Sequence, residues 1–144
     1  MEMSIHLATS LALAAALYPF FGWASLFVVA GGFLIDIDHY FLYVYKTKKF
    51  SIKGCYDFYM LPPKNGNFFN NKDSLLIFHT IELIISILIL ALFNVYIRVV
   101  LFGLLLHLSL DAYWRLTKAK SLLISQPSII WFMLKQKKEI AQQN

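Results

Sequence analysis

Long apolar stretches are the feature that most constrains how this chain can fold. Crossing the ~30 Å hydrocarbon core of a bilayer takes ~20 helical residues, because each residue of a helix rises about 1.5 Å. The last three of four such stretches have this length, whereas the first is short and needs a thinned bilayer or the support of its neighbours. The four stretches are residues 4–18, 22–45, 75–93 and 95–114.

The composition excludes an ordinary soluble domain. Hydrophobic residues make up 59% of the 144 residues and charged residues only 15%, whereas about a quarter of the residues of a soluble domain are charged. No linker or repeat divides the sequence. We therefore predict an all-α integral membrane protein with a single domain over residues 1–144. Its core is a bundle of about four transmembrane helices, followed by a C-terminal interfacial helix.

The first apolar stretch is predicted to be one of these helices and not a cleaved signal peptide. A signal peptide starts with basic residues and ends in small ones. Here Glu2 and His6 stand at the start, and the stretch runs into YPFFG.

Lysine and arginine residues predict the orientation. All but one of the 13 lie in the loop 46–73 or in the tail 115–144, and the exception is Arg98. By the positive-inside rule both segments face the cytoplasm, and an even number of spans places the amino terminus there too. We expect a multi-pass protein of the cytoplasmic (inner) membrane with both termini in the cytoplasm. The net charge of +5 follows from this topology, so it indicates no nucleic-acid partner.

The loop and the tail carry further signals. In the tail, SIIWFMLKQKKE joins an apolar cluster to lysines, which is typical of a helix at a membrane surface. The loop contains Cys55, the single cysteine, which has no partner for an intrachain disulfide and is interpreted as an incidental thiol. Whether the loop closes over a site as a lid is left open.

Ionisable residues inside the apolar stretches are the strongest functional signal. A charged side chain at mid-membrane costs about 2.5–3.5 kcal/mol on insertion scales. Several in one small bundle should therefore face inward and be paired or bound to something. All four histidines and four of the eight acids lie there: His6, Asp36, Asp38, His39, His79, Glu82, His107 and Asp111.

Their depth and spacing place these groups together. Each lies within roughly 6–15 Å of the cytoplasmic end of its own helix, so one shallow pocket open to the cytoplasm can gather them. His79 and Glu82 are three residues apart, and His107 and Asp111 are four apart. Each pair therefore projects from one face of its helix.

The segment GGFLIDIDHY is the densest in acids. Asp36 and His39 share a helix face, whereas Asp38 points elsewhere on a regular helix. Gly31 and Gly32 precede them, and they favour close helix packing or a local irregularity that brings Asp38 round.

Imidazole and carboxylate groups without a thiolate predict a metal site. Zinc is the first expectation, and manganese or iron are alternatives. One ion with further carboxylates around its ligands, or two ions a few Å apart, would use the whole set. The predicted cofactor is therefore a divalent metal, as one or two ions, whose charge neutralises acids that lipid would otherwise reject.

Four segments together resemble a known family. His6, GGFLIDIDH, FHTIE and GLLLHLSLDAYW are similar to the motifs of the inner-membrane-bound metal-dependent hydrolases, also described as LexA-binding inner-membrane-associated hydrolases. The match covers the apolar stretches and not the loop or the tail. The family's usual proline before the first acid is absent, since Leu34 and Ile35 precede Asp36. The resemblance implies metal-dependent hydrolysis at the membrane.

The predicted mechanism is hydrolysis by metal-activated water. Catalytic roles are expected for Glu82, as the general base, and for Asp38. A site that opens at the lipid headgroups favours a lipid phosphoester or ester as the substrate. The expected ligands are His39, His79, His107 and Asp111, with Asp36 or Asp38 as a further ligand; His6 and Glu82 complete the candidate set.

Two alternatives come from other classes. The same groups are typical of a proton or metal-ion pathway in a transporter, although their restriction to the cytoplasmic half disfavours it. The chain is alternatively a scaffold with a structural metal that binds a protein through its basic segments. Lipid is expected as the environment. The identities of the substrate and of the metal are left open, as is whether the protein forms a homo-oligomer.

Overall fold

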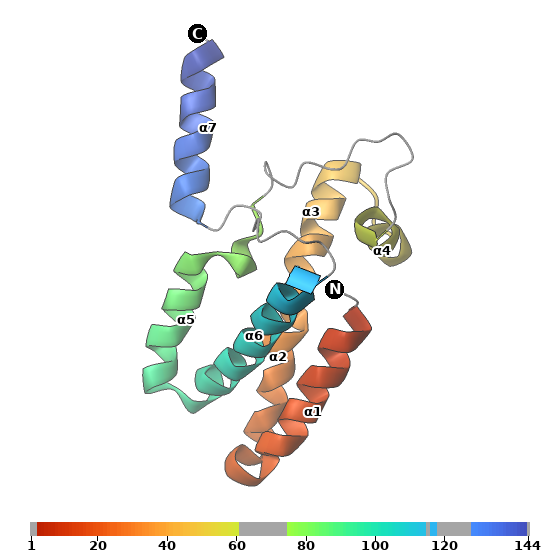
Figure 1. Cartoon of the computed structure of the whole chain (residues 1–144), viewed down its shortest axis with the longest axis vertical. Coiled ribbons are helices and arrows are strands. Elements are labelled where there is room, and N and C mark those ends of the chain that lie inside the picture. Colours follow the sequence, from red (N-terminus) through yellow and green to blue (C-terminus); the bar gives the residue numbers. More distant parts are fainter. Residues whose placement is uncertain (1–2, 61–74, 115, 118–127, 144) are drawn as a thin grey trace. The chain divides into compact units, whose positions relative to one another are not determined.

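The computed structural model describes residues 3–60, 75–114, 116–117 and 128–143, and all regular secondary structure in these ranges is helical (Figure 1). The prediction of an all-α protein is confirmed for this part of the chain. Contacts group the chain into two compact units. Unit 1 comprises Met1–Ile35 and Ile84–Leu123, and unit 2 comprises Asp36–Leu83 and Ile124–Asn144.

Unit 1 is built on a helical hairpin. The helix α1 spans Met3–Phe21, and the chain returns through the 3₁₀ helix η1 (Gly22–Phe27) and α2 (Val28–Gly32), which pack against α1 (Figure 1). The reversal occurs at Gly22, whose φ of +54° suits a residue without a Cβ. The helix α1 therefore runs three residues past the predicted end, through Pro19 in its last turn.

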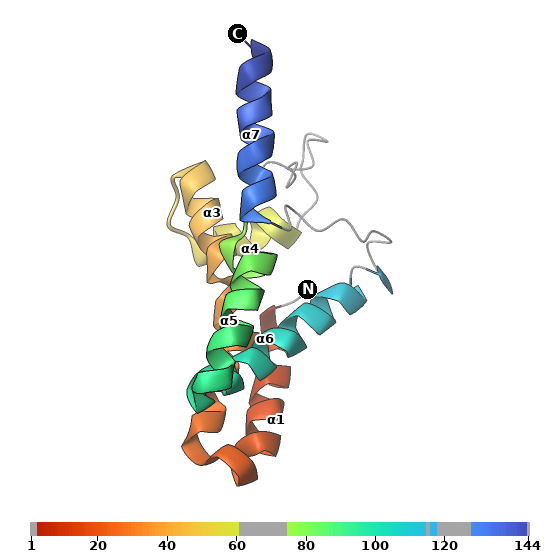
Figure 2. The same cartoon turned by 90° about the vertical axis from the view of Figure 1, so that its left-hand side faces the viewer.

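The second hairpin of the chain joins α5 (Ile81–Phe93) to α6 (Val95–Trp114) by a sharp turn (Figure 1 and Figure 2). Asn94 caps α6, because its Oδ1 accepts the N–H groups of Tyr96 and Ile97 at 2.8 and 3.2 Å. Arg98 Nε donates to the carbonyl of Ala91 at 3.1 Å, which satisfies an acceptor at the end of α5. The bounds of α6 are those of the predicted stretch.

Glycines bring α2 and α6 into close contact. A Cβ on Gly31 would overlap the carbonyl oxygen of Val100, and one on Gly103 would overlap that of Val28. Helices approach this closely only where small residues face each other. Val28, three residues before Gly31, and Leu104, next to Gly103, are fully buried.

Unit 2 contains helices of at most 15 residues. They are α3 (Ile37–Thr47), α4 (Ile52–Met60), the 3₁₀ helix η4 (Ile77–His79) and α7 (Ile129–Gln143). Tyr43 of α3 is buried against α4, with its ring centroid 5.4 Å from that of Phe58. Cys55 of α4 is half-buried, and burial raises the pKa of its thiol, which fits an unreactive cysteine.

Two predicted helices are interrupted. The stretch 22–45 is broken at Phe33 (φ −128°, ψ −49°), after which the 3₁₀ helix η2 (Leu34–Asp36) leads into α3. In the stretch 75–93, Thr80 is extended (φ −84°, ψ 149°) and the α-helix starts only at Ile81. Of the predicted loop 46–73, the described part holds α4; residues 61–74, and residues 118–127 of the tail, lie outside the described residues.

Two helical segments of the described chain are long and apolar enough to cross a membrane. They are the run Met3–Thr47, which includes the hairpin, and Val95–Trp114, whereas Ile81–Phe93 is apolar but shorter. Many large apolar side chains on these helices are exposed, among them Leu11, Leu92 and Phe93. Such a surface suits lipid better than water.

We expect Gly103→Ala to lower the free energy of unfolding by about 1–3 kcal/mol, because the added methyl group forces α2 away from α6. Chemical unfolding in detergent micelles measures this change. Leu105→Ala, at an exposed position of the same helix, is the matched control and should cost less. Equal stability of Gly103→Ala and the wild type would contradict the close packing.

Candidate metal centre

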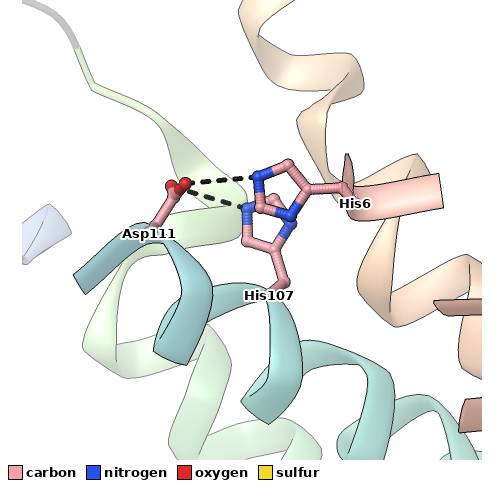
Figure 3. Close-up of side chains that lie close together, drawn as sticks. All are labelled: His6, His107 and Asp111. Atoms are coloured by element: carbon pink, nitrogen blue, oxygen red, sulfur yellow. Dashed lines mark ion pairs between the residues drawn. The ribbon is translucent and has the colours of Figure 1, made fainter. Parts of the chain in front are cut away.

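In unit 1, three ionisable side chains form what we call the α1–α6 cluster: His6, His107 and Asp111. His6 projects from α1, and the other two come from α6 (Figure 3). His6 Nε2 lies 3.3 Å from Asp111 Oδ1, and His107 Nε2 lies 3.7 Å from Asp111 Oδ2. The two imidazole rings stack with centroids 4.1 Å apart. Both Nε2 atoms therefore face one carboxylate.

The backbone of α2 determines which nitrogen of His107 carries the proton. His107 Nδ1 lies 3.1 Å from the carbonyl oxygen of Gly32. Because a carbonyl only accepts, Nδ1 must donate, and Nε2 of the neutral ring then holds a lone pair. That lone pair faces the acceptor Asp111 Oδ2. A proton or a metal cation between these two acceptors, which lie 3.7 Å apart, would stabilise the pair.

Burial makes polar atoms of this cluster energetically costly unless they are paired. His6 is 1% exposed and His107 0%. His6 Nδ1 is buried and has no hydrogen-bond partner among the described residues, which is costly for a polar atom away from water. One turn further along α1, Ser10 is buried as well, and its Oγ donates to the carbonyl of His6 at 2.6 Å.

The donor set of the α1–α6 cluster fits a divalent metal. Two imidazoles and a carboxylate are ordinary zinc ligands, and bonds of about 2.0–2.2 Å in a tetrahedral site separate neighbouring ligand atoms by about 3.3–3.6 Å. The distances of 3.3 and 3.7 Å from the Nε2 atoms to the carboxylate oxygens are close to this range. Three protein ligands would leave one position of a tetrahedral ion for water or substrate.

Unit 2 holds a second group, which we call the α3–η4 cluster: Asp36, Asp38, His39 and His79. His79 Nδ1 lies 3.2 Å from Asp38 Oδ2, and the N–H of Phe78 donates to the same oxygen at 3.1 Å. Asp36 Oδ1 lies 3.6 Å from His39 Nε2 and 3.7 Å from His79 Nε2. His79 is buried, whereas His39 is 29% exposed, so this cluster has a more open side at His39.

The breaks in the predicted helices build this second cluster. Asp36 ends η2 and His39 lies in the first turn of α3, and the two side chains are paired as their spacing of three residues predicted. His79 ends η4 and is followed by the extended Thr80, so the segment leaves helical geometry and the N–H of Phe78 is directed at Asp38. Asp38, in the first turn of α3, therefore reaches the cluster through its contacts with Phe78 and His79.

Glu82 belongs to neither cluster in the described part of the chain. Its carboxylate accepts hydrogen bonds from Ser128 Oγ and from the N–H groups of Ile129 and Ile130, the latter two at 3.1 and 3.3 Å. Ser128 Oγ in turn accepts the N–H of Trp131 at 3.2 Å. Together they cap the amino terminus of α7, where a negative charge also complements the helix dipole.

All the other predicted site residues lie in one of the two clusters, and the single cytoplasm-facing pocket stays a prediction. Sequence reasoning missed three polar partners: the carbonyl of Gly32, the N–H of Phe78 and the hydroxyl of Ser128. The first two are backbone groups that carry no residue-type signal. Ser128 follows SQP and precedes an apolar run, which is a helix-cap signal that a search for caps would have found.

Comparison with known proteins identifies no relative: no family model, curated protein or solved structure matches the chain.

We expect Glu82→Ala to loosen the first turn of α7, because three donors lose their acceptor. Hydrogen–deuterium exchange of the amides of Ile129 and Ile130 should become faster, and Glu82→Gln, which keeps one acceptor oxygen, should have a smaller effect. Lys137→Ala, later in α7, is the control and should leave this exchange unchanged. Unaltered exchange in Glu82→Ala would rule out the cap.

Proposed function

We propose that the protein is a membrane-embedded, metal-dependent hydrolase that acts on a lipid phosphoester or ester at the cytoplasmic face of the inner membrane. The observation that supports it best is the α1–α6 cluster, in which two buried imidazoles face one carboxylate at distances close to those between metal ligands. An intramembrane cluster of this kind is functional far more often than structural. The resemblance of the motifs to membrane-bound hydrolases favours the same chemistry.

The proposed membrane topology has four spans. They are α1, the return segment from η1 to α3, the region of α5, and α6, with both termini in the cytoplasm. The support comes from the two segments that are apolar enough to cross and from the apolar surface of α5. At about 1.5 Å per residue α5 alone is too short, so its span would include the segment that precedes it or a thinned bilayer.

The residues of the two clusters would hold the metal ions. His6, His107 and Asp111 would hold one ion, and the α3–η4 cluster a second. A bound divalent cation supplies Lewis acidity, which polarises an ester or phosphoester and acidifies water. Zinc is the first choice for imidazole and carboxylate donors, and manganese or iron are alternatives.

The contacts of Glu82 favour a role in capping α7 over a role in proton transfer. A carboxylate that already accepts three hydrogen bonds is stabilised in its charged form, which makes it a weak proton acceptor. We therefore propose that Glu82 anchors the interfacial helix and is not the predicted general base.

Lysines favour an anionic lipid over a neutral one. The corner between α3 and α4 carries Lys46, Lys48, Lys49 and Lys53, and no acid lies between Asp38 and Asp57. Lys48 and Lys49 are exposed. Each such lysine near a membrane surface attracts anionic headgroups by about 1 kcal/mol, so a phosphoester substrate is preferred.

Metal content tests the proposal first. Wild-type protein purified in detergent without chelators should retain about one ion per site, and His107→Ala and Asp111→Asn should each lose about one. Ser109→Ala, an exposed position between them on α6, is the matched control and should keep the wild-type content. Elemental analysis measures all four.

Activity is measured on the same preparations. Metal-loaded wild type should hydrolyse lipid phosphoesters or esters in mixed micelles, and the two ligand variants should lose at least about 100-fold in rate. A folded, metal-free wild type would overturn the proposal. Metal-bound protein that moves ions across liposomes without turnover would favour the transporter, and metal without either activity would favour the scaffold.

A further inference from the structure

We propose that the two aspartates of the α3–η4 cluster have different roles: Asp36 is a metal ligand, and Asp38 is a positioning residue that orients His79. The spacing of the sequence does not distinguish them. This inference rests on the proposed metal-dependent function for the role of Asp36, whereas the contact between Asp38 and His79 stands by itself.

The two aspartates contact different nitrogens of His79. Asp38 lies at Nδ1, and Asp36 lies at Nε2. Asp38 Oδ2 accepts the N–H of Phe78 at 3.1 Å and lies 3.2 Å from His79 Nδ1. An ionised carboxylate only accepts, so His79 Nδ1 carries the proton. This fixes the tautomer of His79 and leaves the lone pair on Nε2, as in the carboxylate–histidine–metal arrangement of many metal sites.

Asp36 lies where a ligand is expected. Its Oδ1 is 3.7 Å from His79 Nε2 and 3.6 Å from His39 Nε2. These distances are longer than a good hydrogen bond and near the ~3.3–3.6 Å that separates the ligand atoms of a zinc site. The lone pair of His79 Nε2 thus meets a carboxylate oxygen, which repeats the juxtaposition of His107 with Asp111.

A rival arrangement uses Asp38 as the ligand. Its second oxygen, Oδ1, is buried without a hydrogen-bond partner among the described residues, and Asp38, His39 and His79 each offer an atom within 4.8 Å of the others. That arrangement would require His79 to bind through Nδ1 or to turn away from Asp38. The two arrangements therefore predict different tautomers of His79.

The test compares Asp36→Asn and Asp38→Asn in the full-length protein. Nitrogen-15 spectra of the histidine side chains, recorded without metal, report the tautomer of His79. We expect the Nδ1–H form in the wild type and in Asp36→Asn, and a mixture in Asp38→Asn. Asparagine keeps an oxygen for the N–H of Phe78, so the variant should fold. Asp57→Asn on α4 is the control.

Cobalt(II) is the second probe, because its visible spectrum reports ligand number. Asp36→Asn should lose the bands of this centre, whereas Asp38→Asn should keep them with a dissociation constant raised about 10–100-fold. Loss of the bands in Asp38→Asn and their retention in Asp36→Asn would overturn the assignment, as would an Nε2–H tautomer in the wild type. If the wild type shows the expected tautomer and binds no metal, the hydrolase proposal and the role of Asp36 fail, and the role of Asp38 stands.

Discussion

The close contact of α2 with α6 is the constraint on which the unit 1 site depends. Without a side chain at Gly31 and Gly103, the backbones meet closely enough for the Gly32 carbonyl to accept a hydrogen bond from His107. That bond fixes the ring, and the other ring nitrogen, Nε2, faces Asp111. The packing of two apolar helices thereby sets the geometry of a group that could hold a metal ion.

Both clusters use the same principle at different places in the chain. In each, one ring nitrogen of a buried histidine donates to a fixed acceptor, and the other faces a carboxylate oxygen. In unit 1 the acceptor is the Gly32 carbonyl, and in unit 2 it is the Asp38 carboxylate. The recurrence on unrelated local backbones supports the proposal that these histidines are metal ligands.

Sequence reasoning found the residue types and the helices, and it failed where backbone geometry decides. Composition and spacing were enough to predict an all-α chain, the bounds of α6 and the pairing of His107 with Asp111. The extended Thr80 and the break at Phe33 were beyond a hydropathy pattern, because both lie in apolar runs that favour a helix. The contacts of Glu82 with α7 were missed for another reason, since its partners lie 46 to 48 residues further along the chain.

Arg98 has a consequence for how such a chain enters a bilayer. It is the one lysine or arginine outside the two lysine-rich segments, and its guanidinium donates to the carbonyls of Ala91 and Leu92 at the end of α5. In the proposed topology this cation must be translocated. Because the cation is bound to the preceding helix, α5 and α6 would insert together as one hairpin, with the charge carried across at its tip.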